Sequence, residues 1–544
     1  MPFGILEDRH LENVPGTGLL SDLGVEHGAK VAISEGSMLK RGKGRHAHII
    51  LIPQPSDDPR DPLNWPRWKK EACFWTLAFA ASLDGALSPM ASAGYVLLSK
   101  QFGVSVDEVT SSFGTILLGL GCFMLFQGAL AAKFGHRIVY LGSVSLMFVS
   151  CIWCAASPSL ASIRASRVFQ GFGMSALQSL TATTVEQIYF VHERGMRTIL
   201  WSFSILAGIT LGPLICSYVI ENISWEMGFW FVSIALGISV LSVFFFIPET
   251  TFHRDTRLSQ DAPSLVENEK QELSKETSAV SVEEAPSIED RPSTRPPSYL
   301  SQLKIYSGTY SKQNFLKIFI RPFPFLLSPV TIFLLLTHGM QTVWLSLVPL
   351  CSSTIFTLEY GFTASQIGLT NLGGLVGIVL GMVVTGPLID WGVVWMSRRN
   401  KGIYEPEFRL IFMSGMLFGF FGYVGWAVGN DHRMPWIGAV ACIMMLNFSM
   451  IISGSAAVTY LLDAHGPNAL HCLAISNFTK NMVLYGTTFF ANGMVINRGV
   501  RTSLLILAAC QGFCWLSSIP MYIFGKRARS YIARHPKFFV IDDF

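Results

Sequence analysis

The sequence is short of charge. Only 14% of its 544 residues are Asp, Glu, Lys or Arg, and half are hydrophobic, whereas a soluble domain carries about 25% charged residues. This balance excludes an ordinary soluble protein and indicates a chain that crosses a membrane many times. The net charge of +4 is small, and the basic residues stand beside apolar runs. Nucleic-acid binding is therefore a poor explanation of the charge.

Three other signatures are missing. The sequence has no Gly-x-x-x-x-Gly-Lys-Ser/Thr loop, which argues against ATP hydrolysis. Its ten cysteines lie mostly inside apolar runs without metal-ligand spacing, so we expect small buried side chains, no metal site and no cofactor. Residues 1–60 hold no apolar segment behind a basic start, so we expect the first membrane span to direct insertion instead of a cleaved signal peptide.

Long apolar runs fill most of the chain. About 20 helical residues cross the roughly 30 Å of bilayer hydrocarbon, and such runs predict an all-α membrane protein with twelve transmembrane helices in two six-helix, pseudo-symmetric bundles. The expected helices are 72–94, 109–131, 138–157, 161–186, 199–220, 227–247, 325–349, 366–390, 408–429, 435–461, 473–496 and 502–524. The predicted division is an N-terminal tail (1–70), a first bundle (71–250), a linker (251–321), a second bundle (322–524) and a C-terminal tail (525–544).

The predicted linker and tails are polar. Residues 251–321 are rich in Ser, Glu, Lys, Arg and Pro, and such a segment buries too little surface to offset its ordering entropy, so we expect it to be disordered. Lys and Arg gather in the loops on the side of the termini, which predicts that both termini and the linker are cytoplasmic. No retention motif ends the chain, so the plasma membrane is the default expectation.

One membrane element occurs twice. The run 112–137 is a glycine-stepped apolar segment that ends in a charged tight turn, and a near twin occupies 373–392. A chain that repeats such an element is expected to consist of two homologous halves. Transporters with a central site between the repeats are commonly built in this way.

The repeat and its turns resemble the major facilitator superfamily, whose loop motif is close to Gly-x-x-x-Asp-Arg-x-Gly-Arg-Arg. Ala132 stands where the acid of the first copy is expected. The resemblance covers about residues 60–530 and implies a secondary transporter, not an enzyme, in which two bundles rock about a central site. The matching residues are Gly128, Lys133, Gly135 and Arg137 in the first copy and Gly386 and Asp390 in the second.

Further motifs narrow the resemblance. Arg167 and Gln170 belong to an Arg-x-x-Gln-Gly-x-Gly signature, and Gly208-x-x-x-Gly212-Pro213 is similar to an antiporter motif, although Cys216-Ser217 replaces its following glycine pair. Sugar-porter signatures are absent. Four segments resemble a fungal branch of drug:proton antiporter-like facilitators, which includes toxin and metabolite exporters and polyamine uptake systems: Val14–Thr17, Asp61–Lys70, Pro248–Thr250 and Glu405–Leu410.

Charged residues inside the first-half runs need a reason, because a charge within the bilayer costs several kcal/mol. Asp84 lies about twelve residues into the first run, where the resemblance places the central cavity. It is either a site for a proton or cationic substrate or a hydrogen-bonded structural acid. The resemblance implies that Arg167 takes part in proton coupling, with Gln170 one turn away on the same stripe.

In the second half, His338, Gln341 and Trp344 recur at every third residue. A histidine can titrate in the working range and an aromatic ring can hold a cation, but a histidine satisfied by a backbone carbonyl is the alternative. Asn447 and Lys480 are the other deep polar residues. We expect Lys480 to pair with an acid or with backbone carbonyls.

Gating residues are expected at helix ends and glycine seams. Glu186 can close an ion pair with Lys133, Arg137 or Arg194, and Asp390 can act likewise; a merely solvated acid is the alternative for both. Glycines at every fourth residue, in 208–212 and 373–381, are expected to let the helices 199–220 and 366–390 cross closely. Pro213 is expected to bend its helix.

These observations leave several functions open. The favoured one is proton-coupled export of a small amphipathic or cationic compound, such as a toxin, drug or secondary metabolite. Proton-coupled uptake of polyamine-like cations or other nutrients is the alternative, and a transporter-like nutrient sensor is a different class. The expected partners are a small-molecule substrate, protons and the lipid bilayer, with a monomeric chain.

Overall fold

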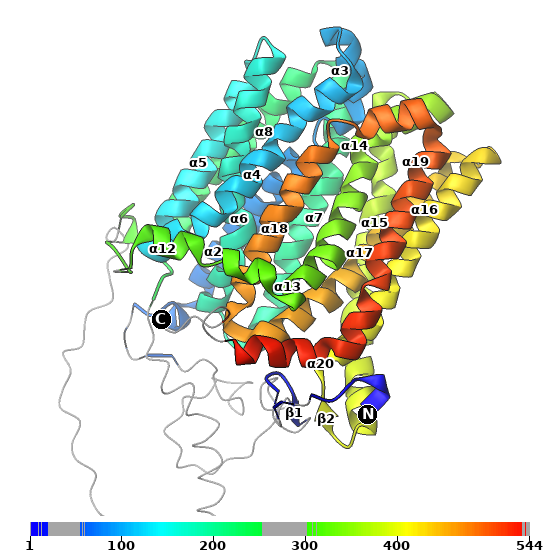
Figure 1. Cartoon of the computed structure of the whole chain (residues 1–544). Helices are drawn as coiled ribbons and strands as arrows, with labels where there is room; N and C mark the ends of the chain where they lie inside the picture. Colours follow the sequence, from blue (N-terminus) through cyan, green and yellow to red (C-terminus); the bar gives the residue numbers. More distant parts are fainter. Residues whose placement is uncertain are drawn as a thin grey trace, which may run out of the picture.

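The computed structural model describes residues 2–8, 10–11, 14–19, 55–56, 58, 60–252, 302–306, 308–311, 313–535 and 539. Long helices run side by side through one bundle, with the first half in blue to cyan-green and the second in green to red (Figure 1). The expected disorder of the linker falls mostly on residues 253–301, which lie outside the described residues.

Six helices of the first half span the bundle. Serine side chains begin three of them by accepting from a backbone N–H one turn on: Ser105, Ser159 and Ser224. The first helix ends two residues before Pro89, and the short α3 (Tyr95–Phe102) follows. The spanning helices are α2 (Arg67–Leu87), α4 (Val106–Phe134), α5 (His136–Ala155), α6 (Leu160–Ile188), α7 (Val191–Asn222) and α8 (Trp225–Phe246).

The second half repeats this plan with more irregularity. Its first spanning element contains a π-helical turn, Leu335–Gly339, between α13 (Pro329–Leu334) and α14 (Met340–Tyr360). A capping box of Thr363 and Gln366 begins α15 (Ala364–Arg399). The other elements are the 3-10 helix η7 (Pro406–Gly415), α16 (Met416–Asp431), α17 (Trp436–His465), α18 (Ala469–Thr487), α19 (Ala491–Leu516) and α20 (Ser518–Arg534).

Nine helical segments of the described chain are long and apolar enough to cross a membrane by length and composition. The helices α2, α6 and α18 run beside them and complete the twelve predicted. These three carry Asp84, Arg167 and Lys480 respectively. The least apolar spans are therefore those that hold the candidate charges.

Two predicted boundaries need correction. Residues 302–321, assigned to the disordered linker, include the helix α12 (Phe315–Ile320), where Phe319 packs on Phe126 of α4 with ring centroids 4.4 Å apart. The predicted C-terminal tail is helical as far as Arg534, because α20 packs across the end of the second half. Aromatic and basic residues that contact the bundle order both segments.

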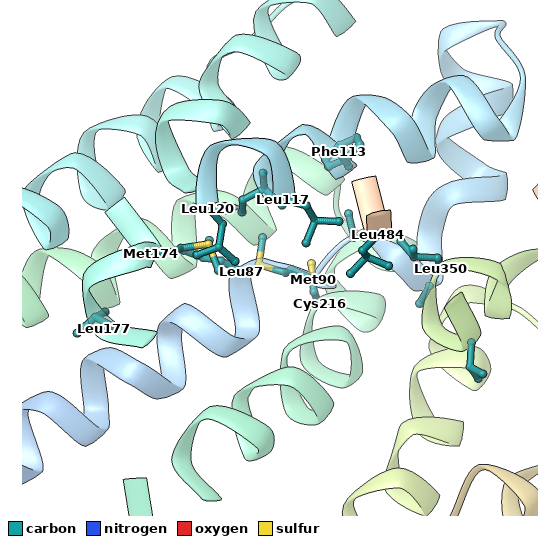
Figure 2. Packing of buried hydrophobic residues seen from close by; sticks show 14 of the residues in the cluster. Leu87, Met90, Phe113, Leu117, Leu120, Met174, Leu177, Cys216, Leu350 and Leu484 are labelled. Atoms are coloured by element: carbon teal, nitrogen blue, oxygen red, sulfur yellow. The ribbon is translucent and has the colours of Figure 1, made fainter. Parts of the chain in front are cut away.

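The largest apolar cluster crosses between the halves. Figure 2 shows Met90, Leu117 and Cys216 of the first half close to Leu350 and Leu484 of the second. These five side chains are at most 9% exposed. Burial of this apolar surface holds the halves together at that level.

The N-terminal segment, residues 2–19, packs on the second half. Its strand β1 (Gly18–Leu19) pairs antiparallel with β2 (Ile403–Tyr404), and the Leu6 amide donates to the Ile523 carbonyl at 3.0 Å. Ile5 and Val14 are buried. We call the end of the bundle that carries this segment and α20 the terminal end, and the opposite end, with α3, the far end (Figure 1).

Candidate functional site

Asp84 is fully buried near the end of α2. Gln178 of α6 donates to its Oδ2 at 2.9 Å, while its Oδ1 has no hydrogen-bond partner among the described residues. The adjacent Gly85 lets α7 approach closely, since a Cβ there would strike the Ile205 carbonyl oxygen. A buried carboxyl with one free oxygen can take a proton or a donor group of a ligand.

Arg167 lies fully buried in α6 and holds the end of α2. It donates to the carbonyl oxygens of Leu87 and Ser88, each at 3.0 Å, and to Gln170 Oε1 at 2.7 Å. Its guanidinium also stands 5.5 Å from the Phe113 ring centroid. The structure thus places Arg167 and Gln170 in contact, and Arg167 binds the backbone carbonyls where α2 ends. The coupling role of Arg167 stays a prediction.

The π-helical turn of the second half holds His338. Its Nδ1 has no partner within the described ranges and lies 3.0 Å from where a Cβ on Gly454 of α17 would stand. Three residues on, Gln341 donates to Ser449 at 3.1 Å and accepts from Ser453 at 2.6 Å. Gln341 therefore joins α14 to α17. The alternative expectation, that His338 hydrogen-bonds a backbone carbonyl, is not met at its Nδ1.

Trp344, Asn447 and Lys480 have separate surroundings. Trp344 interacts with the Cys514 thiol of α19. Asn447 donates to the Ile443 carbonyl at 2.9 Å and faces Gly374 of α15. Lys480 in α18 makes no ion pair or hydrogen bond with any described residue. The expected pairing of Lys480 with an acid or with carbonyls is not seen among the described residues.

Two carboxylates of the first half cap helices of the second half at the far end. Asp107 accepts from the backbone amides of Asn492 and Gly493, at 2.8 and 2.7 Å, at the start of α19. Glu221 accepts from the Ser365 amide at 2.6 Å, at the start of α15. Helix N-termini favour negative charge. Together with the apolar cluster, these caps close the far end.

The predicted glycine seams pack differently from expectation. Gly208 and Gly212 of α7 lie against Ser82 and Ala86 of α2, not against α15. The seam of Gly373, Gly377 and Gly381 lies against α17, at Val440, Met444 and Ile451. The helices α7 and α15 do cross, but at other residues, with Gly368 against Ser217. The glycine spacing predicted close approach correctly and its partner wrongly. Pro213 lies inside α7, as predicted.

In the first loop motif, Gly135 and Arg137 make close contacts with other segments. Gly135 has φ +91°, and a Cβ there would lie 2.5 Å from Glu249 Oε2. The Glu249 carboxylate accepts from the amides of His136 and Arg137, at 3.0 and 3.2 Å. The buried Arg137 side chain donates to the carbonyl oxygens of Phe244 at 2.8 Å, of Ile247, and of Leu303 and Lys304 at 3.1 Å.

The second copy of the motif and the other predicted gate residues make fewer contacts with neighbouring segments. Asp390 is exposed and has no partner in the described part of the chain. A Cβ on Gly386 or on Gly128 would meet no atom within 4 Å. Of the partners proposed for Glu186, the structure brings Arg194 near, and its guanidinium donates to the Glu186 carbonyl oxygen at 2.7 Å.

A charge cluster at the terminal end was missed by sequence reasoning. Arg529 of α20 is buried between the carboxylates of Glu405 and Glu407, at 2.9 and 2.7 Å. Lys526 bridges Glu405 and Glu7, each at 2.7 Å. The only sequence signal was the Glu405–Leu410 motif. Its acids meet partners that lie more than a hundred residues away.

A second part of that cluster centres on Asp463. Arg409 pairs with it at 2.8 Å, and the Tyr404 hydroxyl donates to the same carboxylate. Burial, and secondly the Asp463 charge, raise the pKa of Tyr404. The hydroxyl therefore remains protonated and available as a donor. These contacts give Asp463 a structural role.

The far-end acids Asp107 and Glu221 and the Asp84 partner Gln178 were also missed. Asp107 and Glu221 look like ordinary helix-end acids in sequence. No group of three or more His, Cys, Asp or Glu suited to a metal ion occurs among the described residues. The described groups can accept protons or form hydrogen bonds within each half, at Asp84 and Gln178 in the first and at His338 and Gln341 in the second.

The family profile described as Major Facilitator Superfamily matches residues 74–471. The chain is 26% identical to Protein HOL1 of Saccharomyces cerevisiae, over 96% of this chain and 97% of that protein. It is 27% identical to MFS-type transporter penM of Penicillium rubens, over 93% of each. Efflux pump radE of Floropilus chiversii is 24% identical, over 89% of this chain and 84% of that protein.

Among solved structures, the crystal structure of D-xylose-proton symporter superposes with a TM-score of 0.56. The alignment has 14% sequence identity and covers 84% of this chain and 99% of that chain. At this identity the likeness concerns the fold alone. It is consistent with two six-helix bundles.

Proposed function

Because the chain belongs to the major facilitator superfamily, we propose that this secondary transporter is a proton-coupled exporter of a small amphipathic or cationic compound. The observation that carries the proposal is Asp84, a fully buried carboxyl with one oxygen held by Gln178 and the other free. A carboxyl within a membrane bundle is a candidate relay for protons. The caps of Asp107 and Glu221 close one end of the molecule, as a transporter requires in one of its states.

The direction of transport is inferred from two observations. Relatives named as efflux pumps cover most of this chain, and Gly208, Gly212 and Pro213 match an antiporter motif. The terminal end is proposed to face the cytoplasm, because Lys and Arg concentrate there, and the membrane to be the plasma membrane. Uptake of polyamine-like cations is the second candidate, favoured by the carboxyl at Asp84.

The test is growth and accumulation in cells that express wild type or Asp84→Asn, with a panel of polyamines and of cationic and neutral toxins. Each condition is repeated with a protonophore. An exporter gives resistance with less accumulated compound, and the protonophore abolishes that difference. Asp84→Asn should abolish transport at equal expression. Asp431→Asn, at an exposed pair with Arg501, is the matched control and should transport normally.

Two results would contradict the proposal. Greater accumulation in wild-type cells would identify an uptake system. Full transport by Asp84→Asn would assign that carboxyl a structural role and direct the search for a coupling site to Arg167 and His338.

A further inference from the structure

Lys480 is a cation in the middle of α18, seven residues before that helix ends. A charged side chain at such depth is expected to be paired or to line a water-filled cavity. Lys480 is neither hydrogen-bonded nor ion-paired within the described ranges. Lys480 is only partly buried as a residue.

A second nitrogen group lies beside it. His338 stands in the π-helical turn Leu335–Gly339, and the Ser476 hydroxyl, one turn before Lys480, lies 3.7 Å from the Cβ position of Gly339. This places α18 against the π-helical turn of the second half. Such turns often mark functional sites, and the free Nδ1 of His338 adds a hydrogen-bonding atom.

The helices around this pair offer no counter-charge at the same depth. Asp463 of α17 lies near that helix's last residue and is held by Arg409 and Tyr404. The acids of α14 and α4 lie at the far end, where Glu359 ends α14 and Asp107 caps α19. The remaining acidic, basic and histidine residues on these packed elements lie at helix ends: Glu108, Lys133, His465 and His471.

We propose that Lys480, with His338 beside it, binds an anionic group of the substrate, so that the transported compound is an acid or a zwitterion and not a simple polyamine. This inference rests on the proposed transport function and narrows its substrate class. A carboxylate would accept from the ammonium in a charge-assisted hydrogen bond. A compound with only amino groups would place like charges together and lose that bond.

The experiment compares compounds that differ by one carboxylate. The purified full-length protein is titrated with four pairs of compounds, each an amino acid and the amine that lacks its carboxylate, and thermal stabilisation is the readout. The pairs are ornithine with putrescine, histidine with histamine, lysine with cadaverine, and tryptophan with tryptamine. We expect at least one acid-bearing member to bind about tenfold or more tightly than its amine, the effect typical of a hydrogen bond to a charged group. Lys480→Met should remove this preference and Lys480→Arg should keep it.

Lys100→Met, in the short α3 at the far end, is the matched control and should leave the preference unchanged. Three results would each overturn the inference. Every amine could bind as tightly as its acid-bearing partner or more tightly, no acid-bearing compound could bind, or folded Lys480→Met could keep the preference unchanged. Folding of each variant is checked by its elution as a single species. If the protonophore-sensitive export of a carboxylate-free compound is found instead, proton-coupled transport stands and this inference fails.

Discussion

The two halves each bury one arginine at the terminal end, but they satisfy it differently. Arg137 follows the first loop motif and donates to backbone carbonyl oxygens, including that of Phe244. Arg529 lies on the last helix, between the carboxylates of Glu405 and Glu407. The second copy of the motif meanwhile leaves Asp390 exposed.

This difference shows which features the two copies of the motif share. In both halves the glycine-stepped helix has the same place in the bundle, because packing depends on small residues at fixed spacing. The polar contact at its end depends on whichever segment lies nearby. In the first half that segment is Glu249 and the linker, whereas the second half uses α20 and the N-terminal segment instead.

The largest effect is expected from Arg529→Met, which leaves the buried Glu407 carboxylate without a basic partner and leaves Glu405 with Lys526 alone. Leaving a buried carboxylate unpaired should cost about 3–5 kcal/mol, seen as a lower unfolding temperature of the purified protein. Arg527→Ala, which alters an exposed neighbour, should cost less than about 0.5 kcal/mol. Equal stability of the two variants would mean that the acids find other partners.

A smaller effect should separate the two motif copies directly. Gly135→Ala forces a side chain into a positive-φ position and against Glu249, which should cost about 1–3 kcal/mol. Gly386→Ala meets no atom and lies in a helix, so it should be neutral or stabilise by up to about 1 kcal/mol. Unfolding temperatures measure both. A similar loss in both variants would show that the copies are equivalent after all.

At the far end, Asp107→Asn should loosen the cap on α19. Loss of a charged cap costs about 1 kcal/mol, so the amides of Asn492 and Gly493 should exchange hydrogen about fivefold faster. Exchange measured by mass spectrometry on peptides spanning these residues tests this. Glu108→Gln is the control, because its partner Arg164 lies within the same half. Unchanged exchange in Asp107→Asn would show that the cap contributes nothing.

The smallest change in stability is expected from Asp390→Asn. With no partner in the described chain, its loss should alter stability by less than about 0.5 kcal/mol. If Asp390 forms a gate contact in another state of the transport cycle, the variant should move substrate more slowly at equal stability. Unchanged transport would leave the second copy with a packing role only.

Much of the fold was predictable because it depends on local properties. Hydrophobic length predicted the twelve spans, and glycine spacing predicted close helix packing. The same spacing could not reveal that Gly208 faces α2 instead of α15, since any helix can fill a groove of small residues. The order of the described part of residues 302–321 was missed because composition says nothing of Phe319 packing on Phe126.

The candidate site was predictable in part. Asp84 and Lys480 stood out because charge is costly in an apolar run, and Arg167 through a motif. Their partners did not, because Gln178 lies 94 residues from Asp84 and is an ordinary polar residue in sequence. The Asp107 cap joins positions 385 residues apart. The sequence alone does not show which residues so far apart will meet.

The place of the N-terminal segment also orders the assembly of the molecule in time. Residues 15–19 are translated before the membrane helices, yet they pair with β2, which follows α15, and with Arg529, which follows the last span. The segment must therefore wait on the correct side of the membrane until the whole chain is inserted. The segment can dock only after the intervening helices have been inserted in the correct orientation. The contact therefore forms only in a correctly inserted chain.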